Sequence, residues 1–210
     1  MGLAERKERE KNELRELILL KAKEIIIREG QEKLSLRKIA NEIEYSPATI
    51  YLYFQDKDEI LYQMMDKGFE LMASQMQQVY HEPSALKRLF LIGRSYIRFG
   101  TENQDWYELM FNSTSPMNHI ERCKAEWGHG IATFEFLVAT CREALVESGK
   151  KDVDERIMAL QLWCAVHGLV SLANTQRLLI VDGNCSQGKD CELIDKTLEN
   201  IMYTLFNYKI

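Results

Sequence analysis

The chain has 210 residues, of which 46% are hydrophobic and 28% are charged. This length suits one large domain or a small domain followed by a larger one, and the composition is that of a globular protein. The sequence contains no run of about 18 consecutive apolar residues, and its first fifteen residues are rich in Glu, Lys and Arg instead of carrying the apolar segment of a secretory signal. We therefore expect a cytoplasmic protein that has no membrane partner.

The net charge of −5 at first disfavours a nucleic-acid partner, because phosphate binding depends on Lys and Arg. The local charge is different. Between residues 33 and 57 the chain carries four basic residues, Lys33, Arg37, Lys38 and Lys57, against three acidic ones, which gives this segment a net charge of +1. This excess is small, so it indicates a nucleic-acid face only in combination with a motif.

The cysteines do not predict a metal site. Five are present, an odd number without the paired C-x-x-C spacing of a structural zinc site. They are Cys123, Cys141, Cys164, Cys185 and Cys191. We expect reduced thiols. His119 and Cys123 have the spacing of two ligands on one helix face, but the sequence supplies no further ligands beside them, so we expect no metal and no cofactor.

The hydrophobic pattern predicts an all-α fold of about nine helices, because the apolar residues recur at a 3.6-residue period and only three prolines and eleven glycines interrupt them. We expect these helices over residues 12–29, 36–43, 46–54, 57–79, 85–100, 105–111, 118–147, 154–181 and 191–208. Gly128 and Gly130 are the expected kink point of the helix over 118–147. A polar loop over 182–190 joins the last two helices.

The second and third predicted helices form the pattern of a helix-turn-helix. Ser35 is the expected N-cap of the first of them, and Ser46 with Pro47 opens the second as an N-cap followed by a proline at the first helical position. A second helix that follows the first after three or four residues can enter the major groove of DNA. By geometry alone, a helical hairpin inside an enzyme would look similar.

The residues of this segment resemble the N-terminal signature of the TetR family of transcriptional repressors. The similar stretches are residues 34–43 (LSLRKIANEI), residues 46–54 (SPATIYLYF), Lys57 and the pair Ile60 and Leu61. The resemblance covers about residues 10 to 65, and beyond it residues 163–169 (WCAVHGL) look like the dimer-forming region of many members. It implies a helix-turn-helix DNA-binding domain over 1–56, followed by a larger helical domain for ligand binding and dimerisation over 57–210.

The resemblance also assigns the residues that would contact double-stranded DNA. They are Ser35, Arg37, Ser46, Pro47, Ala48, Thr49, Tyr51, Leu52, Tyr53 and Lys57. Residues 46–49 would lie nearest the base edges and residues 51–53 along the groove and backbone, while Ser35, Arg37 and Lys57 would hold phosphates. Tyr51 and Tyr53 could instead pack inside the small bundle. Because residues 46–49 include no Arg, Asn or Gln, base reading would depend on thymine methyl groups, water and DNA shape.

In the family that the chain resembles, the second domain encloses a pocket for an effector. The aromatic and other bulky residues that could line it are Phe69, Tyr96, Phe99, Trp106, Tyr107, Met110, Trp127, Phe134 and His167. For each of these the alternative is an ordinary place in the core. His167 could be a ligand contact, a donor at a dimer interface or a core histidine with a satisfied hydrogen bond. The composition predicts a small apolar or amphipathic effector.

The last two long helices carry more apolar residues than one body needs to bury, which predicts a homodimer that joins two helices from each subunit in a four-helix bundle. The candidate interface residues are Ile157, Leu160, Cys164, His167, Ile194, Leu198, Ile201 and Leu205. A two-fold dimer would present two recognition helices to successive major grooves, so the operator should be a near-palindrome.

Taken together, these features predict a DNA-binding transcriptional regulator, a repressor that a small molecule releases from its operator. The alternatives for the regulatory sense are an activator and a ligand-independent regulator. A helical enzyme is disfavoured because G-x-S-x-G, H-E-x-x-H, P-loop and G-x-G-x-x-G motifs are all missing from the sequence. A structural or adaptor protein is the other competing class, and neither class predicts specific, salt-sensitive binding to a duplex.

Overall fold

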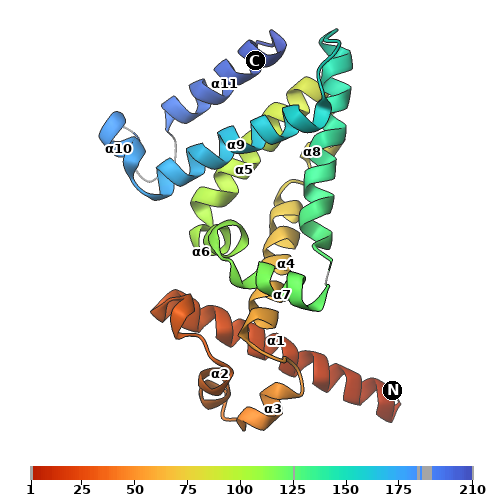
Figure 1. Cartoon of the computed structure of the whole chain (residues 1–210), viewed down its shortest axis with the longest axis vertical. Coiled ribbons are helices and arrows are strands. Elements are labelled where there is room, and N and C mark those ends of the chain that lie inside the picture. The colour runs from red at the N-terminus through yellow and green to blue at the C-terminus, as the bar shows by residue number, and fades with distance from the viewer. Residues whose placement is uncertain (1, 125, 184, 186–190, 210) are drawn as a thin grey trace. The chain divides into compact units, whose positions relative to one another are not determined.

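The computed structural model of the chain describes residues 2–124, 126–183, 185 and 191–209. Within these residues the regular structure is entirely helical, with eleven α-helices and three short 3-10 or π segments, which confirms the all-α prediction (Figure 1). The α-helices are α1 (Leu3–Glu29), α2 (Leu36–Glu42), α3 (Pro47–Tyr51), α4 (Lys57–Gln75), α5 (Ala85–Glu102), α6 (Gln104–Tyr107), α7 (Ser115–Cys123), α8 (Gly128–Glu147), α9 (Glu155–Asn174), α10 (Arg177–Val181) and α11 (Glu192–Phe206). The short segments are η1 (Gln31–Lys33), η2 (Val79–His81) and η3 (Glu108–Asn112).

The chain divides into two compact units. The first, called here the N-terminal unit, comprises Met1–Lys67 and Leu109–Glu126, and the second, called here the body, comprises Gly68–Glu108 and Trp127–Ile210. Helix α4 contributes its first part to the N-terminal unit and the rest to the body. This division by packing differs from the functional division predicted at residues 56 and 57.

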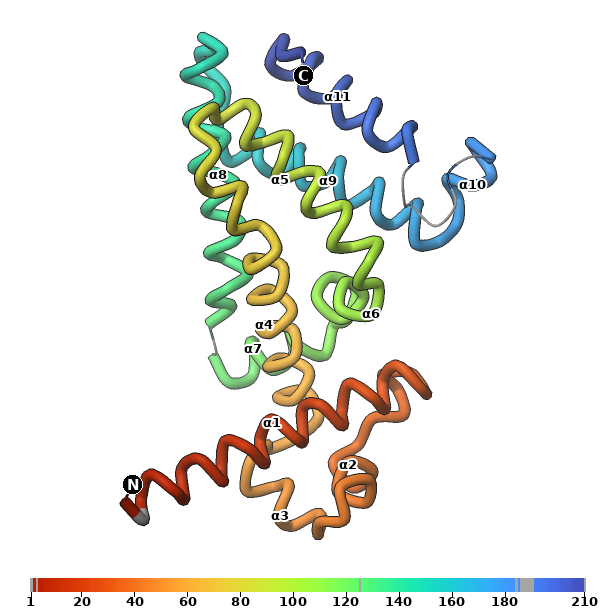
Figure 2. Tube along the Cα trace, turned by 180° about the vertical axis from the view of Figure 1, so that it is seen from behind, coloured from red at the N-terminus to blue at the C-terminus, as the bar shows by residue number. Residues whose placement is uncertain are grey.

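In the N-terminal unit α2 packs against both α1 and α3 (Figure 2). Ile18, Ile25, Ile39, Ile50 and Phe54 are its fully buried centre. The two predicted caps are present. Ser35 Oγ accepts the Lys38 N–H at 3.2 Å, and Ser46 Oγ accepts the Thr49 N–H at 3.1 Å, so both short helices begin where the sequence indicates.

In the body, α5 packs against both α8 and α9, and α11 lies along α5 (Figure 2). Two glycines of α5 allow this close approach. A Cβ atom at Gly100 would lie 2.6 Å from Val170 Cγ1 of α9, and one at Gly93 would lie 3.0 Å from Leu198 Cδ1 of α11. A larger residue at Gly100 would therefore push α5 and α9 apart.

Two of the predicted long helices are broken in the structure. The helix predicted over 118–147 is divided into α7 and α8, because Lys124 takes a left-handed conformation with φ of 52°. The helix predicted over 154–181 is divided into α9 and α10 at Gln176, which has φ of 58°. Residues other than glycine rarely adopt a positive φ. Because these two breaks occur at a lysine and a glutamine, the positions of the glycines did not predict them. Gly128 begins α8 instead of kinking a longer helix.

Helix α1 begins at Leu3, well before the predicted start at residue 12. Its first turns have no apolar stripe, but Arg6 pairs with Glu10 and Arg9 pairs with Glu13, each four residues apart on one helix face. Such pairs favour a helix by a few tenths of a kcal/mol each, roughly, without any tertiary packing.

Reduced thiols were the wrong expectation for two cysteines. Cys185 and Cys191 form a disulfide, with their Cα atoms 4.6 Å apart. The sequence signal was their separation of only six residues, between the end of α10 at Val181 and the start of α11 at Glu192. Most of the loop predicted over 182–190 lies outside the described residues. Cys123, Cys141 and Cys164 are free thiols, as expected.

Candidate functional site

The N-terminal unit exposes two cations that lie on either side of α3 in the sequence. Arg37, in the first turn of α2, is exposed, and Lys57, at the start of α4, is partly exposed. Neither side chain forms a hydrogen bond or ion pair with another residue of the described chain. Lys38, by contrast, is held by Glu29 of α1. The positive charges of Arg37 and Lys57 are therefore available to an anionic partner.

The carboxylates on both sides of Lys57 are neutralised from α7. Arg122 Nη2 lies 2.6 Å from Asp56 Oδ2, and Arg122 Nη1 lies 3.7 Å from Asp58 Oδ2. Tyr62 of α4 stacks on His119 of α7, with ring centroids 4.9 Å apart, and fixes this contact. Because Arg122 offsets the neighbouring acids, the field around Lys57 is more positive than the local sequence suggests.

Helix α3 presents hydroxyl, apolar and aromatic groups to solvent. Ser46 Oγ, besides capping the helix, lies 2.9 Å from Thr49 Oγ1, so these two hydroxyls are hydrogen-bonded to each other. Ala48 and Tyr51 are exposed, and Leu52 keeps 80% of its surface. The alternative that Tyr51 packs inside the bundle is wrong. Tyr53 is only partly exposed, and its carbonyl accepts a 3.1 Å hydrogen bond from Arg15 of α1.

A polar aromatic cluster lies inside the body, where α5, α6 and α9 meet. Tyr96 Oη lies 3.0 Å and Tyr107 Oη lies 2.6 Å from His167 Nδ1, and the Trp163 indole N–H donates to Tyr96 Oη at 3.2 Å. Burial raises the pKa of Tyr107 to about 12, raises that of Tyr96 further, and lowers the pKa of His167. All of these groups are therefore uncharged near pH 7. They form one hydrogen-bonded centre.

The structure brings together some of the predicted effector-site residues and separates others. Tyr96, Tyr107 and His167 are in direct contact, while Phe69 and Trp127 form an edge-on pair 5.7 Å apart elsewhere in the body. Phe134 lies beside Trp163, with ring centroids 5.8 Å apart. The predicted residues are all buried or half-buried: Phe69, Tyr96, Phe99, Trp106, Tyr107, Met110, Trp127, Phe134 and His167. Trp163 was missing from the prediction, although its position one helical turn before His167 was a usable signal.

Met110 does not belong to the body. It is buried in the N-terminal unit, because the chain leaves the body within η3, after Glu108. The sequence could not indicate this, since nothing in the local pattern separates residues 104–107 from residues 109–112. The prediction that Met110 lines the same pocket as Tyr107 was therefore wrong.

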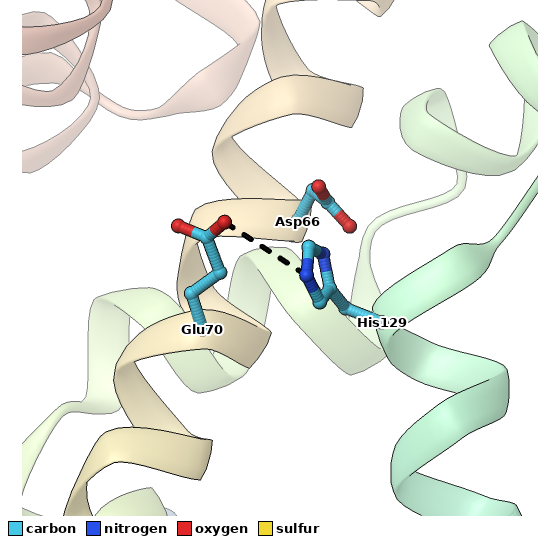
Figure 3. Close-up of side chains that lie close together, drawn as sticks. All are labelled: Asp66, Glu70 and His129. Carbon is cyan, nitrogen blue, oxygen red and sulfur yellow. Dashed lines mark ion pairs between the residues drawn. The ribbon is translucent and has the colours of Figure 1, made fainter.

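The start of α8 has a tightly defined arrangement around Trp127. The indole covers Gly130, where a Cβ atom would lie 2.0 Å from Trp127 Cε2, so only glycine fits beneath the ring in this arrangement. The indole N–H is buried and has no hydrogen-bond partner in the described part of the chain. Two residues after Trp127, His129 Nε2 lies 3.8 Å from Glu70 Oε1 of α4, a contact that becomes an ion pair when the histidine is protonated (Figure 3).

A groove of about 430 Å³ runs between α5 and α11, and it contains none of the predicted effector-site residues. Its charged side chains are largely paired with one another. Arg94 lies 3.6 Å from Asp195, and Arg98 lies 3.2 Å from Glu102. The groove therefore offers no excess of either charge.

The predicted interface residues fall into three groups. Ile157 and Leu160 on α9 keep 60% and 49% of their surfaces, and Cys164 is also exposed. His167, Ile201 and Leu205 are half-buried. Ile194 and Leu198 were wrongly assigned to the interface, because both are buried in the chain's own core as α11 packs on α5. Four further apolar residues of the body are exposed at the other end of α9 and on α10, and the prediction did not include them: Leu172, Leu179, Ile180 and Val181.

Helix α9 is long and apolar enough to cross a membrane, judged by length and composition only. This measure is weak evidence for a single helix, because core helices of soluble proteins meet it too. The buried side of α9 packs on α5 and α8, through residues that include Ala159, Val166 and Val170. Its other side carries Ile157 and Leu160.

Comparisons with known proteins agree with these observations. Residues 18–64 match the family model described as bacterial regulatory proteins of the tetR family, and residues 89–185 match a tetracyclin repressor-like C-terminal domain. An HTH-type transcriptional regulator of Haemophilus influenzae is 35% identical over 72 residues, which are 34% of this chain and only 38% of that protein. The match therefore covers well under two thirds of that relative's length.

Solved structures share the fold over nearly the whole chain. A Rhodococcus protein of unknown function is 20% identical, with a TM-score of 0.70 over 92% of this chain and 94% of that one. A TetR/AcrR-family transcriptional regulator from Thermobifida fusca is 22% identical, with a TM-score of 0.63 over 89% of this chain and 96% of that one. With two family models matching the two parts of the sequence and a helix-turn-helix in the structure, the chain belongs to the TetR family of DNA-binding transcriptional regulators.

Proposed function

We propose that this regulator is a cytoplasmic repressor that binds a near-palindromic operator as a homodimer and leaves it when a small molecule binds the body. The observation that carries the operator proposal is the pair of available cations, Arg37 and Lys57, on either side of the exposed helix α3. Phosphate contacts from such cations fix the register of a protein on DNA, and the helix between them reads the base edges. We propose no catalytic activity, and an activator or a ligand-independent regulator is the alternative.

The exposed apolar residues of α9 support the homodimer. Ile157 and Leu160 lie on one side of the helix, and Cys164 continues the same side one turn later. An apolar stripe of this kind is stabilised when a second copy covers it. Two-fold pairing would place two copies of α3 against successive major grooves, which is the reason for expecting a near-palindrome.

Phosphate contacts at Arg37 and Lys57 make a testable prediction. Arg37→Ala or Lys57→Ala should weaken binding to cognate and scrambled duplexes by a similar factor and reduce the slope of log affinity against log salt by about one unit. The preference for the cognate duplex should remain. The measurement is fluorescence anisotropy across a salt series, with a cognate duplex obtained by selection from a random pool.

Lys38→Ala is the matched control, because this lysine is one residue from Arg37 but is already held by Glu29. We expect a smaller change of slope in this variant. If Lys57→Ala removed only the preference for the cognate duplex and left the slope unchanged, Lys57 would be a base contact and the assignment would fail.

For the effector we propose an apolar or amphipathic molecule with one polar group, which the centre formed by Tyr96, Tyr107 and His167 would bind. A ligand present at about 100 times its Kd should stabilise the folded protein by about 2.7 kcal/mol. Thermal unfolding against a panel of fatty acids, aromatic acids and small charged metabolites measures this, and the compounds that stabilise should also release the duplex. Stabilisation by small, highly charged metabolites alone would contradict the proposal.

A further inference from the structure

The exposed surface of α3 carries few groups that can read bases by hydrogen bonding. Its five residues are Pro47, Ala48, Thr49, Ile50 and Tyr51, and none of them is charged or carries an amide. Bidentate recognition of guanine or adenine uses Arg, Lys, Asn or Gln. Bidentate reading is therefore not available to the side chains of α3, and the remaining polar groups are the hydroxyls of Ser46 and Thr49 at its start and the exposed hydroxyl of Tyr51 at its end.

The hydroxyls of Ser46 and Thr49 are hydrogen-bonded to each other. Ser46 Oγ accepts the Thr49 N–H at 3.1 Å and lies 2.9 Å from Thr49 Oγ1, so one hydroxyl donates to the other. Of this pair, a single hydroxyl hydrogen remains to donate, and the Tyr51 hydroxyl likewise offers one. One donor finds an acceptor on adenine, guanine or thymine in the major groove, so it discriminates poorly among them.

What α3 does offer is methyl groups. Thr49 is half-exposed, and beside the hydroxyl that is hydrogen-bonded to Ser46 its side chain carries one methyl group. Ala48, one residue earlier, is exposed and adds its own methyl. Thymine alone among the four bases carries a methyl group in the major groove, and apolar side chains contact it directly.

We propose that α3 reads its operator half-site through thymine methyl groups, and that the methyl of Thr49 is the main specificity-determining group. The hydroxyl of Thr49 has a different task, which is to hold the side chain against the N-cap Ser46. The proposal rests on operator binding by α3, as proposed above. It predicts that the half-site contains at least one thymine whose 5-methyl group contributes to affinity.

The test removes the methyl group from each partner in turn. A duplex is first selected from a random pool with the wild-type protein, and each thymine is then replaced singly by deoxyuridine, which lacks only the 5-methyl group. At the thymine that Thr49 contacts we expect affinity to fall about tenfold. At the same position cytosine should also bind weakly, and 5-methylcytosine should recover part of the loss.

Two variants separate the methyl from the hydroxyl of Thr49. Thr49→Val keeps the methyl and the shape but lacks the hydroxyl, and it should bind the selected duplex within a factor of about two of wild type. Thr49→Ser keeps the hydroxyl but lacks the methyl. It should lose about tenfold on the thymine duplex and show no further loss on the deoxyuridine duplex, because the same contact is already absent.

Binding to a scrambled duplex, with its salt dependence, and thermal unfolding are measured for both variants to show that each one is folded. If deoxyuridine were tolerated at every position, or if Thr49→Val lost affinity while Thr49→Ser did not, reading by methyl groups would be overturned in favour of the hydroxyl. If the pool yielded no enriched sequence at all, operator binding itself would be overturned. These results distinguish a failure of the inference from a failure of the proposed function.

Discussion

The double variant Ile157→Glu, Leu160→Glu should be a monomer that no longer binds its operator tightly. The two side chains keep 60% and 49% of their surfaces on α9, so charge at these positions costs the isolated subunit little. In a dimer, four buried carboxylates without partners would face one another, which is strongly unfavourable. Sedimentation velocity should show the mass of one subunit, 24.5 kDa, in place of two.

Loss of the dimer should weaken operator binding by roughly 100-fold or more, because the second half-site no longer binds at a high effective concentration. Val146→Glu on α8 is the matched control, since this apolar residue is 78% exposed and lies outside α9. It should remain a dimer. A monomeric Val146→Glu together with a dimeric double variant would move the interface from α9 to α8.

Local chemistry explains which parts of the fold could be predicted. Ser35 and Ser46 begin α2 and α3 as the sequence indicates, because a capping hydroxyl acts on an N–H group only two or three residues away. The breaks at Lys124 and Gln176 escaped prediction for the opposite reason. Neither residue favours a positive φ, so the conformation must come from packing elsewhere, which a local pattern does not contain.

The same distinction applies to the sites. The resemblance to the family predicts a DNA surface over residues 46–53, and Tyr51 and Leu52 within it are exposed. Ile194 and Leu198 have the spacing of an apolar stripe on one helix face. The spacing predicts that the stripe is buried, but not whether a second subunit or another helix of the same chain covers it. In the structure α5 covers it, with Gly93 making room for Leu198.

An acidic protein can still offer unpaired cations to a phosphate backbone, because pairing decides which charges remain available. Lys38 is paired with Glu29, whereas Arg37 beside it has no partner in the described chain. Arg122 comes from a segment far along the sequence and offsets the acids on both sides of Lys57. Neither pairing can be read from the net charge or from the local composition. The net charge of +1 over residues 33–57 therefore understates how much positive charge is available there.

Phe54→Ala should destabilise the N-terminal unit by about 3 to 5 kcal/mol, the usual effect of removing a large aromatic side chain from a core. The ring is 1% exposed, and the Arg15 guanidinium lies 4.5 Å from its centroid. Arg15 also donates to the Tyr53 carbonyl at 3.1 Å, so Phe54 and Arg15 together fix the end of α3 against α1. Loss of the ring should release α3 and abolish duplex binding.

Hydrogen exchange measured by mass spectrometry is the appropriate test, because the tryptophans of the chain, Trp106, Trp127 and Trp163, all belong to the body and would not report on this unit. Peptides from residues 36–54 should exchange faster in Phe54→Ala, while those from α9 should not change. Leu52→Ala is the control, since a side chain that is 80% exposed should change stability by no more than about 0.5 kcal/mol. If Phe54→Ala lost duplex binding without faster exchange, the ring would be a DNA contact and not the centre of the small core.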